Sequence, residues 1–243
     1  MKGCAEIIPM SMPTRFSTNV STVSAMSVYM SKVYFWMTIG LSITAITAFI
    51  VSHTSLVTSI ITSPVLLIAL LVGEVGLVIA ISAAIHKMSA QTATLLFALY
   101  SFLNGLTLAS IFLVYTLGSI TNAFVATAGT FLAMSVYGTV TKRDLTSLGS
   151  FLFMGLIGLI IAMLVNVFLQ SPAMDFVISG IGVLIFTLLT AYDTQKLRQF
   201  GEGAPTDDGQ ALQRGVVLGA LTLYLDFINL FLFLLRFLGV NRD

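Results

Sequence analysis

Asp226 is the residue whose chemistry most needs an explanation. It lies in the middle of the apolar segment 221–235. A charge near a bilayer centre costs roughly 3 kcal/mol on insertion scales, so such residues face a protein interior or an aqueous cavity. The strongest candidate partner is Asp193, which closes the preceding apolar segment. Two carboxylates within a few ångströms cannot both ionise cheaply, so the pair would share a proton and titrate as a unit. Deprotonated, the same oxygens suit a hard cation such as calcium. Asp193 and Asp226 are therefore candidates for proton sensing, gating and transient calcium binding.

The surroundings of the two aspartates differ. Asp193 has an alternative role in an interfacial ion pair, because Lys196 follows three positions later on the same helical face. Asp226 has no such alternative, since counting from Arg214 puts it on the order of 18 Å along its helix, near mid-membrane. Asn229 lies one turn beyond Asp226 and adds a second oxygen-bearing side chain to the same face. The sequence therefore predicts a polar site deep in the last apolar segment.

Two more ionisable residues fall within apolar segments. Glu74 lies about ten residues inside its segment, where it either accepts hydrogen bonds from a neighbouring helix or lines a cation path. Arg236 lies near the end of the last segment, from which its guanidinium can reach the interface. Both readings of Glu74 stay open at this point.

Composition identifies the environment of these residues. The chain is 57% hydrophobic and 9% charged, whereas soluble domains are roughly 25% charged. It is therefore predicted to be an integral membrane protein with the lipid bilayer as its first partner. The net charge of +1 gives no reason to expect nucleic acid as a partner. The single cysteine, Cys4, excludes an intrachain disulfide and a cysteine metal cage. No motif suggests a tightly bound cofactor, which leaves calcium as a permeant ion.

Apolar segments define the architecture, because a helix needs about 20 residues to cross ~30 Å of hydrocarbon. Such segments occur at about 33–51, 65–85, 94–115, 120–140, 147–170, 176–195 and 213–236. We therefore predict an all-α membrane protein with seven transmembrane helices in residues 32–243, preceded by a flexible cytosolic arm, residues 1–31. Pairs of small residues suggest close helix packing; they are Gly73 and Gly76, Gly155 and Gly158, Gly180 and Gly182, and Gly215 and Gly219.

The distribution of Lys and Arg predicts the orientation, because cytosolic loops are enriched in both. Basic residues occur in the arm and after the second, fourth and sixth segments, namely Lys2, Arg15, Lys32, Lys87, Lys142, Arg143, Lys196, Arg198 and Arg214. The opposite loops, near 52–64, 116–119 and 171–175, contain neither Lys nor Arg. The N-terminus is therefore predicted to lie in the cytosol. The stretch 199–210 is predicted to be a flexible cytosolic connector, since Pro205 cannot continue a helix.

Three motifs resemble a known family. Ala191-Tyr-Asp-Thr-Gln195, the segment 223–231 and the segment 234–239 are similar to the signature of the Bax inhibitor-1 family of seven-helix membrane proteins. The resemblance covers the chain from about residue 30, includes Glu74 and is to a bacterial type of member. It implies six helices around a central seventh, and a pH-sensitive calcium leak gated by two aspartates, here Asp193 and Asp226. Bacterial relatives are also associated with a membrane-bound ATP-dependent protease, as substrate or modulator.

The chain departs from the family at one place. Relatives often carry an Arg near the cytosolic end of the second helix that can latch onto the aspartates, whereas this chain reads Ser82-Ala-Ala-Ile-His-Lys87. His86 and Lys87 are the candidates to replace that latch. No leader, long domain or retention signal marks a eukaryotic endomembrane protein, so we expect a bacterial inner membrane.

Three functions compete. The first is a non-enzymatic cation leak with Asp193 and Asp226 as its gate. The second is an intramembrane aspartyl protease; it is disfavoured because bulky Leu223 and Leu225 occupy positions where such enzymes carry glycine in Gly-x-Gly-Asp. We therefore expect no enzymatic activity. The third is a non-conducting regulator of a membrane-bound ATP-dependent protease, with the N-terminal arm as its handle.

Overall fold

Helices make up almost the whole of the described structure. The computed structural model describes residues 15–203 and 208–240, with side chains from residue 25 onward. Within these residues, seven helices are long and apolar enough to cross a membrane. This confirms the predicted seven-helix, all-α membrane fold. Residues 1–14 of the predicted arm, which include Cys4, lie outside the described residues, as do Pro205 in the predicted connector and Arg242 and Asp243 at the end of the chain.

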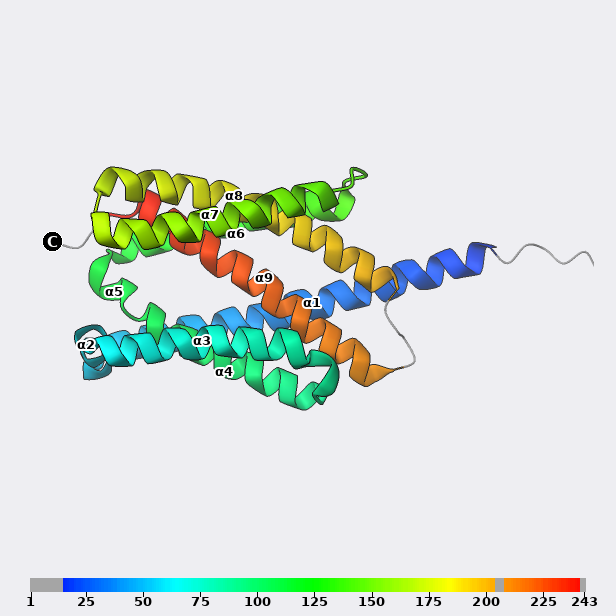
Figure 1. Cartoon of the computed structure of the whole chain (residues 1–243). Coiled ribbons are helices and arrows are strands. Elements are labelled where there is room, and N and C mark those ends of the chain that lie inside the picture. The colour runs from blue at the N-terminus through cyan, green and yellow to red at the C-terminus, as the bar shows by residue number, and fades with distance from the viewer. Residues whose placement is uncertain (1–14, 204–207, 241–243) are drawn as a thin grey trace, which may run out of the picture.

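The elements follow one another along the chain as antiparallel helices joined by short turns (Figure 1). They are α1 (Arg15–Ser52), α2 (Ser55–Thr62), α3 (Pro64–Ala84), η1 (Ile85–Lys87), α4 (Ala90–Leu108), α5 (Ile111–Val114), α6 (Leu117–Val140), α7 (Thr146–Leu169), α8 (Pro172–Glu202) and α9 (Gly209–Leu238). The short helices α2, η1 and α5 connect the longer ones.

Several helix ends differ from the predicted spans. Helix α1 begins at Arg15, inside the segment 1–31 that the sequence analysis treats as a flexible arm. The predicted loop 52–64 contains α2. Helix α8 continues to Glu202, so part of the predicted connector 199–210 is helical. This extension is stabilised by packing, since the rings of Phe200 and Tyr29 lie 5.4 Å apart.

Local sequence explains where the long helices start. The side chains of Ser63, Ser89, Thr116, Ser171 and Asp208 each accept a backbone N–H from the first turn of the helix that follows. Such caps satisfy N–H groups that have no partner inside the helix. Proline occupies the first turn of α3 and α8, where its missing N–H is not needed.

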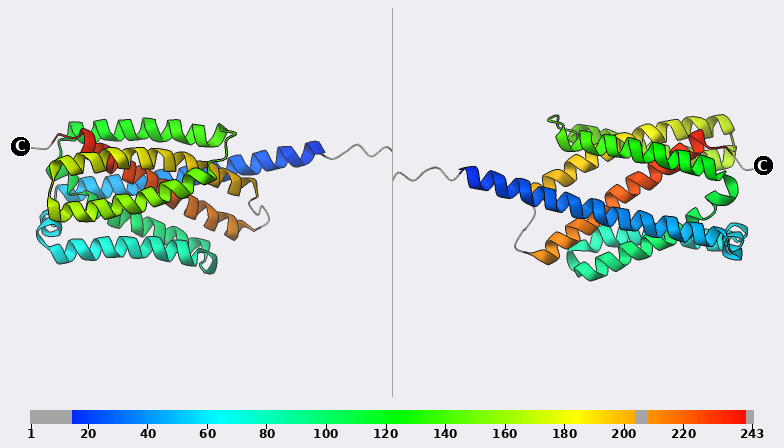
Figure 2. Two further views of the ribbon diagram at one scale, coloured as in Figure 1. Left: turned by 45° about the horizontal axis from the view of Figure 1, so that its top comes forward. Right: turned by 180° about the vertical axis from the view of Figure 1, so that it is seen from behind.

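Helix α9 runs obliquely through the bundle and is the most buried of the seven spans in the described chain (Figure 1). It packs against α1, α4, α6 and α8. Helix α3 packs mainly on α4, and α7 packs on α8. Figure 2 shows the α3–α4 pair on one side of α9 and the α7–α8 pair on the other. The predicted arrangement of six helices around a central seventh is therefore not confirmed, because α3 and α7 stand away from α9.

The glycines reflect the same division. Gly182 lies against the Phe233 ring, so a side chain there would collide with it. Gly219 lies against Leu197 and Tyr29, which would have to shift slightly to admit a side chain. These two positions confirm the predicted close packing. Gly73 and Gly76 in α3 and Gly158 in α7 have no atom of another described element within 4 Å of the position that a Cβ would occupy. For these three glycines the prediction is wrong, because α3 and α7 each contact few other helices.

Candidate functional site

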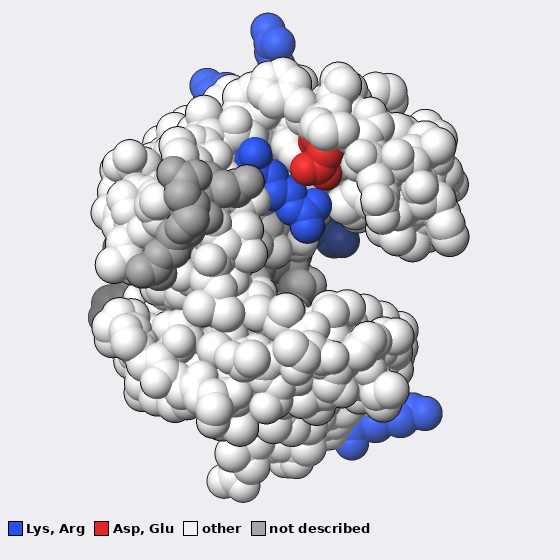
Figure 3. All heavy atoms as spheres, turned by 90° about the vertical axis from the view of Figure 1, so that its left-hand side faces the viewer, with Lys and Arg blue, Asp and Glu red and all other residues white. Residues whose placement is uncertain are grey.

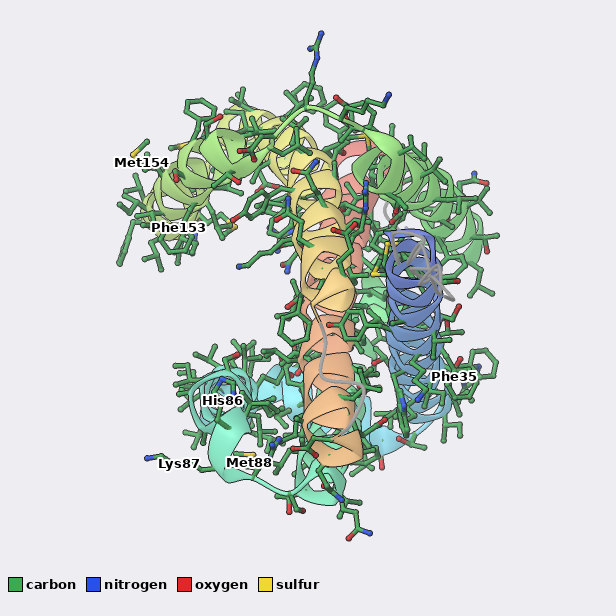
Figure 4. All side chains as sticks on the ribbon, turned by 90° about the vertical axis from the view of Figure 1, so that its right-hand side faces the viewer. Phe35, His86, Lys87, Met88, Phe153 and Met154 are labelled. Atoms are coloured by element: carbon green, nitrogen blue, oxygen red, sulfur yellow. The ribbon has the colours of Figure 1, made fainter. Side chains whose placement is uncertain are left out.

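A cavity of 1020 Å³ separates the α3–α4 pair from the α7–α8 pair, with α9 as its floor. Seen along the helices from either end, the described part of the molecule has the shape of a C (Figures 3 and 4). In Figure 4, Phe153 and Met154 of α7 lie at one lip of the opening and His86 of η1 lies at the other. The cavity is therefore a groove that opens sideways, toward the bilayer. We call it the lateral groove.

Asp193 from α8 and Asp226 from α9 both line the lateral groove. They lie close enough for their charges to interact. Asp226 is only 4% exposed, and its Oδ2 atom is buried without a hydrogen-bond partner among the described residues. Within the same residues, neither aspartate forms a salt bridge. An ionised carboxylate in this position would be expensive, because no hydrogen bond to Oδ2 and no salt bridge from a described residue compensates its burial.

The neighbours of Asp193 in α8 explain why it faces the groove. Ala191 is buried where α6 passes close by, since a Cβ on Gly138 would collide with the Ala191 carbonyl. The Tyr192 ring lies against Gly149 of α7. Gln195 is also buried, on the side facing the α6–α7 turn. The surrounding residues of the motif thus pack against α6 and α7, and Asp193 is left for the groove.

Gln195 has a role that the sequence analysis did not find. Its Oε1 accepts the Leu145 N–H at 2.9 Å, and its Nε2 donates to the Arg143 carbonyl at 2.8 Å. These bonds satisfy backbone groups in the turn between α6 and α7. The sequence feature that could have indicated this role is a long amide side chain two residues after Asp193. Gln195 therefore fixes the start of α7 relative to the helix that carries Asp193.

Lys196 is the cation that shares the groove with the two aspartates. It is exposed and lines the groove. Its Nζ lies 5.9 Å from the centroid of the Tyr192 ring, a cation–π distance. No salt bridge joins it to Asp193 within the described chain. The alternative of an Asp193–Lys196 ion pair is therefore not formed in this structure.

Glu74 is held by the neighbouring helix α4. Its Oε1 accepts the Thr107 hydroxyl at 2.5 Å, and its Oε2 accepts the Asn104 amide at 3.2 Å. The Asn104 Oδ1 accepts the Tyr224 hydroxyl at 3.1 Å, and the Tyr224 and Thr44 hydroxyls lie 2.6 Å apart. We call Glu74, Thr107, Asn104, Tyr224 and Thr44 the polar chain. It links α3, α4, α9 and α1, and of the two readings of Glu74 it favours the hydrogen-bonded one.

The sequence analysis missed four members of the polar chain. Asn104 and Tyr224 lie within apolar stretches, which was a usable signal, because a buried amide or phenol requires a partner. Thr44 and Thr107 gave a weaker signal, since a threonine in a membrane helix can bond to its own backbone. Both do so here, through the carbonyls of Gly40 and Leu103, in addition to their contacts between helices.

Of the remaining predicted site residues, Asn229 lines the groove and two others do not. Asn229 lines the groove and donates its Nδ2 to the Leu225 carbonyl at 2.8 Å, which leaves its amide oxygen for other partners. His86 and Lys87 are exposed in η1 and do not line the groove. In Figure 4, the Lys87 side chain points away from the opening. The structure thus brings Asn229 to the aspartates but not His86 or Lys87.

The oxygens in the groove suit weak rather than tight cation binding. The described residues contain no group of three or more His, Cys, Asp or Glu side chains able to hold a metal ion. Two carboxylates and an amide oxygen fall short of the six to eight oxygens that calcium takes, so water would have to supply the rest. Such a set fits an ion in passage.

Comparison with known proteins identifies the family of this chain. Residues 26–243 match the family model described as "Inhibitor of apoptosis-promoting Bax1". The chain is 51% identical over 229 residues to the inner membrane protein YbhL of Escherichia coli K12, covering 94% of this chain and 98% of that protein. It is also 51% identical over 216 residues to an uncharacterized protein of Borreliella burgdorferi, covering 88% of this chain and 93% of the relative. A Deinococcus radiodurans protein is 39% identical over 226 residues, with coverage of 93% and 96%. The chain thus belongs to the Bax inhibitor family of membrane proteins.

Proposed function

We propose that this protein is a non-enzymatic, pH-sensitive cation leak for calcium, with Asp193 and Asp226 as its proton-sensitive gate. The observation that carries the proposal is the buried Asp226 Oδ2, which has no hydrogen-bond partner among the described residues and lines the same groove as Asp193. A proton shared by the two carboxylates reduces their joint charge to a single negative charge and so lowers the cost of burying them. Loss of that proton leaves two negative charges, which attract a cation.

The proposal gives the pH response a direction. At low pH both carboxyls are protonated, so the pair is neutral and offers a divalent cation little attraction. As the pH rises the pair ionises, and its oxygens, with the amide oxygen of Asn229, replace part of the hydration shell of the ion. Calcium flux should therefore rise with pH. Lys196 lies at the end of the groove toward which the Lys and Arg distribution places the cytosol, so its charge opposes cations that enter there.

The membrane assignment follows the named relative. We propose that the protein resides in a bacterial inner membrane, as the name of the Escherichia coli relative states for that protein. The Lys and Arg distribution supports a cytosolic N-terminus.

The test is calcium flux into proteoliposomes between about pH 5 and pH 8, the range in which a shared, buried proton is expected to titrate. Asp226→Asn should conduct at every pH as the wild type does at the low end, because asparagine mimics the protonated carboxylate. Asp144→Asn, the same substitution at an exposed position in the α6–α7 turn, should keep the pH response. Flux that is unchanged in Asp226→Asn contradicts the gate. No wild-type flux at any pH contradicts the leak and favours a non-conducting regulator of a membrane-bound ATP-dependent protease.

A further inference from the structure

The walls of the lateral groove are apolar and face the membrane. Val75 and Ile79 of α3 and Phe153 and Ile160 of α7 line the groove and are exposed. A groove that opens sideways in a bilayer meets acyl chains rather than water (Figure 3). Hydrocarbon is therefore the default content of its outer part, and the rim decides whether a particular lipid is bound.

An exposed cation of the groove and an exposed anion of helix α8 lie at the same end of the molecule. Arg236 lines the groove near the end of α9, and Asp175 lies near the start of α8; both are exposed. The rings of the residues next to them, Phe176 and Phe237, stack with centroids 4.7 Å apart, so the two charges flank one aromatic contact. Neither charge forms a salt bridge with a described residue. Figure 3, which looks at this end, shows basic and acidic side chains next to each other where the opening meets the body.

The charges of Arg236 and Asp175 both act on Tyr115. Tyr115 lies between the spans Ala90–Val114 and Leu117–Val140, at the same end of the molecule. Burial raises the pKa of Tyr115, the Arg236 guanidinium opposes that shift, and the Asp175 carboxylate adds to it. The Arg236 guanidinium and the Asp175 carboxylate therefore both act on one small region at this end of the molecule.

The part of the groove between Arg236 and Asp226 fits within one leaflet. Arg236 lies ten residues after Asp226 in α9, which is about 15 Å along the helix and less along the membrane normal, because α9 runs obliquely through the bundle (Figure 1). Half of a hydrocarbon core ~30 Å thick is about 15 Å. A lipid whose phosphate sits at Arg236 would thus lay an acyl chain along the part of the groove that leads to Asp226.

From this geometry we propose that the lateral groove binds one phospholipid with an ethanolamine head group, from the leaflet at the Arg236 end. The phosphate pairs with the Arg236 guanidinium, which matches phosphate in a two-pronged geometry. The primary ammonium group donates to the Asp175 carboxylate. One acyl chain lies between α3 and α7 over α9 and closes the groove beside the aspartates. The binding does not depend on the proposed leak.

The experiment is native mass spectrometry of the delipidated full chain in mild detergent, titrated with dioleoyl phosphatidylethanolamine, phosphatidylcholine or phosphatidylglycerol. One ethanolamine lipid should bind per chain, more tightly than the other two. Arg236→Gln should weaken binding about tenfold through the lost charge-assisted pair, whereas Lys87→Gln, which removes a cation outside the groove, should not. Asp175→Asn should abolish the preference for ethanolamine over choline.

The acyl chain has its own control. Val75→Trp fills the groove and should weaken binding, whereas Ile46→Trp on α1 should not; the two positions are 59% and 60% exposed. Glycerophosphoethanolamine, the same head group without acyl chains, should not compete. The proposal is overturned if no lipid is retained or if Arg236→Gln binds the ethanolamine lipid like the wild type. It is also overturned if the free head group competes, or if the protein forms a lipid-free dimer in which a second chain occupies the groove. Because no cation flux is measured, these outcomes are separate from those of the leak assay.

Discussion

Two buried carboxylates line the same groove and have opposite surroundings. Glu74 on α3 is 8% exposed, and both of its oxygens accept hydrogen bonds from α4. Asp226 on α9 is 4% exposed, and its Oδ2 has no partner among the described residues. Glu74 and Asp226 are thus both buried in membrane helices, and they differ in the hydrogen bonds that their carboxylates accept. Glu74 fits a structural role, whereas Asp226 is left to exchange a proton or meet a cation.

The largest contrast is expected in stability. Glu74→Gln places an amide N–H₂ opposite one of two donors, Thr107 or Asn104, and should lower the free energy of unfolding by about 1–3 kcal/mol. Asp226→Asn should cause no loss, because the Asp226 carboxylate forms no salt bridge with a described residue and its Oδ2 accepts no hydrogen bond from one. Thermal unfolding in detergent, followed by circular dichroism, measures both. A larger loss in Asp226→Asn than in Glu74→Gln would invert the comparison.

The second prediction extends the contrast along the polar chain. Tyr224→Phe removes the hydroxyl that joins Asn104 to Thr44. We expect a loss of about 1 kcal/mol, within the range measured for hydrogen bonds between membrane helices. The same unfolding assay tests this, with Tyr34→Phe on α1 as the control. The pH response of flux should remain in Tyr224→Phe, and its disappearance would assign the polar chain to the gate.

The third prediction concerns the cation beside the aspartates. The Lys196 charge favours the ionised form of Asp193, so Lys196→Gln should let the pair hold its proton to higher pH. The pH at which calcium flux reaches half of its maximum should rise by up to about one unit. The shift is smaller than a buried cation would cause, because Lys196 is exposed to solvent. Lys87→Gln should leave the midpoint in place. A shift in Lys87→Gln alone would restore the predicted latch at His86 and Lys87.

The smallest effect is expected at the start of α7. Asp144 Oδ1 accepts the hydroxyl and the backbone N–H of Thr146, and these bonds lower the Asp144 pKa. The folded-state pKa is therefore below the unfolded value, so the bonds stabilise the helix start at neutral pH. This contribution is lost as the pH falls through the folded-state pKa. Asp144→Asn should speed amide exchange at Thr146 near pH 7, and the difference from the wild type should vanish in acid. A difference that persists in acid would contradict this account.

The architecture could be predicted from the sequence, because hydropathy alone marks seven long apolar segments and Lys and Arg mark their connections. Helix ends were less predictable. Helix α8 continues beyond the end of its apolar segment because Phe200 and Gly201 pack against Tyr29 of α1. This is a contact between residues far apart in the sequence. The gap between α3 and α7 also escaped prediction, since a helix that faces lipid and a helix that faces neighbours have similar composition in a membrane.

The site was predictable in part. Asp193, Asp226 and Asn229 were found because a polar group in an apolar segment is expensive, and all three line the groove. The same reasoning found Glu74 but could not tell an anchored carboxylate from a free one. That distinction depends on Asn104 and Thr107, which come from another helix. His86 and Lys87 were selected by their position in the chain, and both are exposed in η1 without lining the groove.

One measurement tests the central claim most directly. Calcium flux into proteoliposomes is followed across the same pH range for Glu74→Gln and Asp226→Asn, two variants that each replace one buried carboxylate by its amide. Our account predicts that Glu74→Gln keeps the rise of flux with pH, even if its stability is reduced, and that Asp226→Asn loses it. A pH response that survives in Asp226→Asn and disappears in Glu74→Gln would contradict the account and would move the gate to Glu74.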